Sequence, residues 1–297
     1  MRSGVPRICN PRAIGRNRRL ERTQPFVPKL VAIQVLRGLA ALSVALLHLE
    51  PEWLLRGAVQ EGWNRPFPLE AGVDVFFVIS GFVMVYASHA LFGRDGAARD
   101  FLVRRFARVV PLYWLTTLVV LGLLAFLPDL MRSAQATPGL VAASFLFVPW
   151  PRPDGIVQPV YTLGWTLNYE MFFYVVFAAT LGLGLKRRAV VACVSLLLAG
   201  LVAIGFARPD LPQPLGFWTS PIQVEFVLGM ALGLARLEGV TLPLALRLAL
   251  AVLGIGLFWL VGGNAGARFG PYAPLLFACP AACLVAACGL SRGRPDG

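Results

Sequence analysis

Charged side chains are scarce in this 297-residue sequence, at 14% of the residues, whereas hydrophobic side chains make up 57%. A soluble globular domain carries about 25% charged residues. With a mean hydropathy of +0.70, the chain has too little polar surface to cover a water-soluble protein. The same figures exclude an intrinsically disordered chain. They point to a membrane protein, because about 20 consecutive apolar residues make one helical span and the sequence has several such runs.

Cysteine is rare and odd in number, with five residues in the whole chain. A disulfide-stapled secreted domain is therefore excluded. Cys279 and Cys283 lie four residues apart, but no histidine or further close cysteine completes a zinc set. The remaining three are Cys9, Cys193 and Cys288. We interpret the cysteines in apolar runs as small hydrophobic residues and expect no metal site.

Acidic residues are few as well, which leaves a net charge of +12. Residues 1–30 hold eight basic groups against the single acid Glu21, directly before the first apolar run. Such a distribution is typical of a membrane protein oriented by cytoplasmic charge, and we expect no nucleic-acid partner. We predict that residues 1–30 form a disordered cytoplasmic tail; the alternative is an upstream extension from a misassigned start.

Nine apolar runs follow this tail, and one of them is too short to span a membrane. They cover residues 31–49, 71–92, 109–128, 139–150, 160–185, 189–206, 215–235, 242–262 and 271–290. If the short run 139–150 is interfacial or re-entrant, all the basic clusters face the cytoplasm: the tail 1–30, the inner loop 94–108 and residues 186–188. The loop 50–70 then lies outside.

We therefore predict an all-α, polytopic membrane bundle with eight spans in the cytoplasmic membrane and with both termini inside. One transmembrane domain would cover residues 31–290, followed by a short cytoplasmic tail, 291–297. No linker is long enough to divide the chain further.

The first run contains two ionisable residues, Arg37 and His48, eleven positions apart. At about 100° per residue, both side chains lie on one helix face, about 16 Å apart along the axis. The residues between them on that face are small and leave room beside the helix: Ala40, Ala41, Val44 and Ala45. Ionisable residues in a membrane helix are costly and mark functional sites. The alternative is that Arg37 reaches the lipid headgroups and His48 is a packing residue.

The second run places Asp74 at a depth similar to that of His48 in the predicted topology. A carboxylate there could orient the imidazole, so that its other ring nitrogen acts as a base. The alternative is that Asp74 caps the start of its helix. Ser80-Gly81, further along this run, is more typical of close helix packing.

Two further groups of polar residues stand out. Arg105 and Arg108 are three residues apart at the cytoplasmic entry of the third span, where they suit a phosphorylated ligand or, alternatively, anionic lipid. Glu170 lies within an aromatic-rich run near the outer edge, with Tyr174 one turn further on. A carboxyl desolvated by aromatic rings suits acid–base chemistry. Glu225 is a weaker second case.

Together these residues predict group transfer at a membrane, from a phosphorylated cytoplasmic donor to a hydroxyl acceptor. There is no Walker loop, dinucleotide fingerprint or metal-ligand set, so the donor itself must contain the reactive group. The alternatives are a transporter or lipid-linked sugar permease, whose buried charges line a substrate path, and a non-catalytic component of polysaccharide export.

The sequence resembles acyltransferase family 3, the multi-pass membrane O-acyltransferases, and within it the branch that acetylates exopolysaccharides. Its motifs are Leu36-Arg37-Gly38 through His48, Gly72 to Phe82, Arg105-Phe-Ala-Arg108 with Pro111-Leu-Tyr113, and Gly164 to Tyr174.

The resemblance implies transfer of an acyl group, usually acetyl, from a coenzyme A thioester to sugar hydroxyls of a surface or secreted polysaccharide. It also implies that Arg37 and His48 are catalytic and that Arg105 and Arg108 handle the acyl-CoA donor. We expect no permanently bound cofactor, and His48 to accept the hydroxyl proton while Asp74 or Glu170 holds the imidazole. A covalent acyl-histidine relay is the main variant.

The chain departs from the family at its end. Members usually have about ten spans and a closing segment with a Ser-Tyr pair and a late histidine. This sequence ends at Gly297 with eight clear runs and without that segment. The expectation is either a truncated C-terminus or a shortened member.

Overall fold

The computed structural model of the chain describes residues 30–55, 68–127, 136–262 and 270–292. Within these ranges the structure is helical and contains no strand, only isolated bridges between Pro151 and Val157 and between Leu242 and Ser291. Residues 1–29 of the predicted tail, most of the predicted outer loop and residues 293–297 lie outside the described residues.

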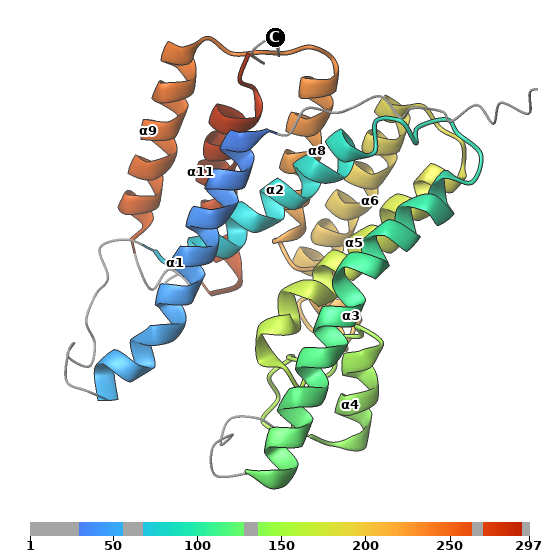
Figure 1. Cartoon of the computed structure of the whole chain (residues 1–297), viewed down its shortest axis with the longest axis vertical. Helices are drawn as coiled ribbons and strands as arrows, with labels where there is room; N and C mark the ends of the chain where they lie inside the picture. Colours follow the sequence, from blue (N-terminus) through green and yellow to red (C-terminus); the bar gives the residue numbers. More distant parts are fainter. Residues whose placement is uncertain (1–29, 56–67, 128–135, 263–269, 293–297) are drawn as a thin grey trace, which may run out of the picture.

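Eight helices of 15 to 30 residues run through the described ranges (Figure 1). They are α1 (Val31–Leu55), α2 (Ala71–Ala87), α3 (Ala97–Phe126), α5 (Trp165–Gly182), α6 (Arg187–Ala207), α8 (Gln223–Leu237), α9 (Leu244–Val261) and α11 (Ala273–Gly289). The shorter ones are α4 (Pro138–Phe145), η2 (Thr162–Gly164), α7 (Leu215–Trp218) and η3 (Gly270–Tyr272). The predicted all-α membrane bundle is confirmed.

Five segments of the described residues are long and apolar enough to cross a membrane. They are Val31–Leu49, Ala97–Phe126, Arg187–Ala207, Leu215–Leu237 and Leu244–Val261. Helices α2 and α11 are apolar but reach only 17 residues. The count of eight spans therefore stays a prediction, although each of the eight runs contains a helix.

The structure changes one helix boundary that the sequence predicted and defines another more closely. Helix α3 begins at Ala97, so most of the predicted inner loop 94–108 forms its first turns. The fourth run yields only α4, eight residues long, which starts at Pro138 with Thr137 as its cap. Eight residues rise about 12 Å, so α4 is too short to cross a bilayer, as predicted.

The described basic clusters share one end of the bundle, uppermost in Figure 1. Helices α3 and α6 begin there with Arg104 and Arg187–Arg188 close to their first turns, and α8 ends there. Arg188 donates to Glu238, just after α8, at 2.9 Å. At the basic end, α6 is therefore connected to the end of α8 by a side-chain contact.

Helix α2 lies inside the bundle, packed against α1, α8 and α11. Its backbone touches that of α8 through glycines. A Cβ atom on Gly81 would lie 2.3 Å from the Phe226 carbonyl oxygen, and one on Gly229 would lie 2.1 Å from the Val78 carbonyl oxygen. Because real Cβ atoms do not approach so closely, glycine is required at this crossing. The rotation of α2 about its own axis is therefore set by α8.

Candidate active site

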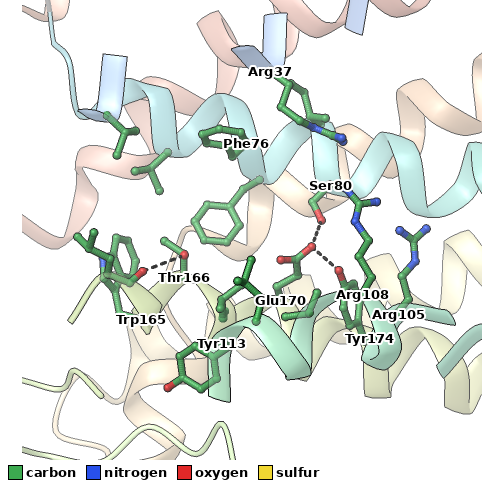
Figure 2. Close-up of a pocket in the computed structure, with 18 of the residues that line it drawn as sticks. Arg37, Phe76, Ser80, Arg105, Arg108, Tyr113, Trp165, Thr166, Glu170 and Tyr174 are labelled. Atoms are coloured by element: carbon green, nitrogen blue, oxygen red, sulfur yellow. Dashed lines mark hydrogen bonds between the residues drawn. The ribbon is translucent and has the colours of Figure 1, made fainter. Parts of the chain in front are cut away.

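A cavity of about 520 Å³ lies between α1, α2, α3 and α5, and five of the six predicted site residues line it (Figure 2). These five are Arg37, His48, Arg105, Arg108 and Glu170. The volume is typical of sites for small molecules, which span about 300–1,000 Å³. The cavity is therefore the natural candidate site of this protein.

The two ends of the cavity are lined by different kinds of residue. Helices α1 and α3 begin at the basic end of the bundle, whereas α2 and α5 end there, so the position of a residue along its helix shows which end of the cavity it lines (Figure 1). Arg105 lies in the first part of α3 and Thr116 lies eleven residues further on. Trp165 begins α5 and Tyr174 lies nine residues inside it. Figure 2 accordingly shows Trp165 on one side of Glu170 and the guanidiniums on the other.

Three guanidiniums gather at the end of the cavity nearer the basic clusters. Arg37 is half-buried and interacts electrostatically with Arg105, Arg108 and Glu170. The Arg105 guanidinium lies 5.8 Å from the ring centre of Tyr174, which holds it by a cation–π contact. With one carboxylate among three cations, this end has an excess of positive charge that suits an anionic ligand.

Glu170 is held by two hydroxyl groups. Its Oε1 accepts a hydrogen bond from Ser80 Oγ of α2 at 3.2 Å and another from the Tyr174 hydroxyl, one turn along α5. The sequence placed Glu170 with His48 near the outer leaflet, away from the arginines. The structure instead brings Glu170 into the electrostatic neighbourhood of Arg37 and Arg105, in the same cavity as His48 (Figure 2).

Asp74 lies apart from the other predicted site residues. It is buried, on the face of α2 that also presents Gly81 to α8, and its carboxyl interacts with that of Glu225. The predicted pairing of Asp74 with His48 therefore has no support in the geometry. The reason is the rotation of α2, which turns Asp74 towards α8 and Ser80 towards the cavity.

Arg37 and His48 do line the same cavity, as the helical spacing predicts. The room expected beside the small residues of α1 is used differently, however. A Cβ atom on Gly72 of α2 would lie 2.7 Å from the Ala40 carbonyl oxygen and 2.9 Å from the side chain of Val44. The small residues thus admit helix α2, while His48 is left exposed at the cavity.

Sequence reasoning missed the contribution of Ser80, which it assigned to helix packing. It also missed the aromatic and hydroxyl side chains at the far end of the cavity, among them Trp165, Tyr161 and Thr116. The spacing of Glu170 and Tyr174, four residues apart, was a usable signal for their hydrogen bond. Ser80 offered none, because its partner is 90 residues away.

The arrangement brings together an imidazole, a carboxylate and a cluster of cations within one membrane-embedded cavity. An imidazole of this kind can accept a proton from a hydroxyl group. The guanidiniums can bind phosphate through charge-assisted hydrogen bonds. Among the residues that the structure describes, no group of three His, Cys, Asp or Glu side chains could hold a metal ion.

Known proteins show clear likeness to this chain. Exopolysaccharide production protein ExoZ of Rhizobium meliloti (strain 1021) is 42% identical over 195 residues, which are 65% of this chain and 59% of that protein. Acyltransferase MdmB of Streptomyces mycarofaciens is 29% identical over 238 residues, or 73% and 60% of the two chains. Peptidoglycan O-acetyltransferase OatA of Listeria monocytogenes serovar 1/2a (strain ATCC BAA-679 / EGD-e) is 28% identical over 181 residues, or 56% and 26%.

The matches to the first two relatives thus span 59% and 60% of their lengths. No solved structure matches the chain. The acyltransferase domain of family 3 matches residues 30–296, which includes every helix described above. The chain therefore belongs to acyltransferase family 3.

Proposed function

We propose that this protein transfers an acyl group, acetyl in the first instance, from acyl-CoA to a hydroxyl of a surface or exopolysaccharide sugar. The observation that carries the proposal is the single cavity that joins His48, Glu170 and three guanidiniums. The names of ExoZ and OatA, which refer to exopolysaccharide production and to O-acetylation of peptidoglycan, support the same class of acceptor.

The guanidinium cluster is the proposed binding site for the phosphate groups of the donor. Coenzyme A is anionic through its phosphate groups, and arginine binds phosphate through a planar fork of donors. Arg105 and Arg108 lie in the part of α3 nearest the basic end, which we place in the cytoplasm of the cell by the positive-inside rule. A cytoplasmic donor would then meet the arginines first.

The opposite end of the cavity is the proposed place for the acceptor. His48 lines this region together with Thr116 and Trp165. Hydroxyl and aromatic side chains of this kind contact sugars through hydrogen bonds and through the apolar faces of the rings. The long arm of coenzyme A would extend along the cavity, so that the thioester meets the acceptor near His48.

In the proposed reaction, His48 accepts the proton of the sugar hydroxyl while the oxygen attacks the thioester carbonyl carbon. The carbon–sulfur bond breaks, an ester forms, and the leaving thiolate takes the proton back from the imidazolium. The negative charge of Glu170 in the same cavity stabilises the imidazolium, and Arg37 stabilises negative charge on the donor.

A relay is the main variant of this mechanism. The acyl group would first move from sulfur to a ring nitrogen of His48, releasing coenzyme A, and then from nitrogen to the sugar oxygen. Radiolabelled acyl groups on the protein in the absence of acceptor would indicate the relay, whereas label found only on the sugar would indicate direct transfer.

The test is transfer of radiolabelled acetyl from acetyl-CoA to an isolated polysaccharide precursor by the protein reconstituted in lipid. We expect His48→Ala to lower the rate at least about 100-fold, the contribution of a general base. His89→Ala is the matched control, because His89 is the second of two histidines and lies just after α2 at the basic end. Unchanged transfer by His48→Ala would eliminate the proposed base, and no transfer from acetyl-CoA by the unaltered protein would eliminate the donor.

A further inference from the structure

The hydroxyl of Ser80 connects two helices inside the candidate active site. Its Oγ donates to Glu170 Oε1 at 3.2 Å, although the two residues are 90 positions apart in the sequence. Glu170 Oε1 also accepts a hydrogen bond from the hydroxyl of Tyr174. Both Ser80 and Glu170 line the cavity, so this bond lies in the wall that a bound substrate would face.

The position of Ser80 is set by the residue that follows it. Gly81 presses the backbone of α2 against that of α8, so α2 cannot rotate without a clash. Phe77, one turn earlier, is packed between two other rings, with centres 5.8 Å from Tyr169 of α5 and 5.0 Å from Phe226 of α8. The Ser80 hydroxyl is therefore presented to Glu170 by a rigid part of the bundle.

The environment of Glu170 makes this bond unexpected. Both Arg37 and Arg105 interact with Glu170 electrostatically. Charge-assisted bonds between arginine and carboxylate are stronger than bonds from neutral hydroxyls. Yet among the described residues no ion pair within 4.0 Å joins Glu170 to Arg37, Arg105 or Arg108. The hydrogen bonds that Glu170 does make come from the two neutral hydroxyls of Ser80 and Tyr174.

We propose that Ser80 is a positioning residue that keeps the Glu170 carboxylate from pairing with the arginines. With Ser80 and Tyr174 bound to Oε1, the guanidiniums stay available for the phosphates of the donor, and the charge of Glu170 stays available to the reaction. This proposal rests on the proposed function, because it assigns the arginines to an acyl-CoA donor.

The first measurement is the equilibrium binding of coenzyme A to the purified protein in detergent by calorimetry. Ser80→Ala should weaken binding about five- to tenfold, because Glu170 then pairs with an arginine. Ser80→Thr, which keeps the hydroxyl, should bind as the unaltered protein does. Ser43→Ala is the matched control: it also removes a helix hydroxyl with a hydrogen bond, from Ser43 Oγ to the Leu69 carbonyl oxygen at 2.8 Å, but lies outside the cavity lining.

The decisive variant is the double substitution Ser80→Ala/Glu170→Gln. A neutral amide no longer competes for the arginines, so this second change should restore the affinity for coenzyme A that Ser80→Ala lost. A packing defect would not be repaired by a change at Glu170. Should Ser80→Ala bind poorly through incomplete folding, the double variant would bind equally poorly, and that result overturns the proposal.

The outcomes separate the two proposals. Absence of coenzyme A binding by the unaltered protein overturns the donor assignment and the positioning proposal with it. Normal binding by the unaltered protein together with unchanged affinity in Ser80→Ala overturns the positioning role alone. A Tyr174→Phe variant should repeat the behaviour of Ser80→Ala, because it removes the other donor to the same oxygen.

Discussion

Arg105 is the best-supported cation of the candidate site. Its guanidinium lies over the ring of Phe101 at 5.5 Å and over that of Tyr174 at 5.8 Å. Two aromatic faces reduce the entropy lost when an arginine binds a ligand, because the side chain is already in place. Its neighbour Arg104 is exposed on the same helix and does not line the cavity, which makes it a natural comparison.

We predict that Arg105→Ala raises the KM for acyl-CoA about tenfold or more, since a hydrogen bond to a charged group contributes about 1.5–3 kcal/mol. Arg104→Ala removes the same charge one residue away and should change this KM less than about twofold. Steady-state kinetics with varied acyl-CoA and saturating acceptor measures both. Equal effects of the two substitutions would mean that surface charge, and not the cavity, is responsible.

The sequence was informative where a single helix decides the geometry. The spacing of Arg37 and His48 was enough to place both on one cavity, and that of Arg105 and Arg108 on one face of α3. It failed for Asp74, because which face of α2 meets the cavity depends on its glycine contact with α8. No pattern within one helix can predict that rotation.

At the level of helices, the charged residues before the third apolar run misled the prediction. They indicated a loop, whereas α3 is one helix of 30 residues from Ala97. Thirty residues rise about 45 Å, which exceeds the hydrocarbon thickness of about 30 Å. The first turns of α3 can therefore lie at the lipid headgroups with their arginines, and hydropathy alone does not separate such turns from a loop.

The contact between α2 and α8 should control the stability of the whole bundle. We predict that Gly81→Ala lowers the free energy of unfolding by about 1–3 kcal/mol, the typical cost of overpacking. For a chain of this size each kcal/mol lowers Tm by about 2–4 °C. Thermal unfolding in detergent, followed by the fluorescence of the seven tryptophans, measures the change.

Gly122→Ala is the matched control for this prediction. Gly122 lies in α3, and a Cβ atom there would meet nothing within 4 Å. Alanine favours the helix over glycine by up to about 1 kcal/mol, so this variant should be as stable as the unaltered protein or slightly more stable. A similar loss of Tm in both variants would show that the crossing at Gly81 has no special role.

For the molecule as a whole, the basic end fixes the orientation that we propose in the membrane. We predict that a cysteine at Ile156, in the loop between α4 and α5, is labelled by a membrane-impermeant maleimide in spheroplasts. A cysteine at Val240, between α8 and α9, should be labelled only after permeabilisation. Both positions are exposed, at 52% and 44%. Both cysteines would be introduced into a variant whose five native cysteines are replaced by alanine. The reverse labelling pattern would show that the chain has the opposite orientation in the membrane.

The separation of about 16 Å between Arg37 and His48 has a consequence for traffic across the bilayer. If the nucleotide part of the donor is retained at the arginine end and the saccharide arrives from the opposite side, neither bulky partner has to cross the hydrocarbon layer. Only the small acyl group would cross the hydrocarbon layer, and it would be enclosed by the protein throughout. Export of the modification would then need neither a nucleotide carrier nor a flipped sugar.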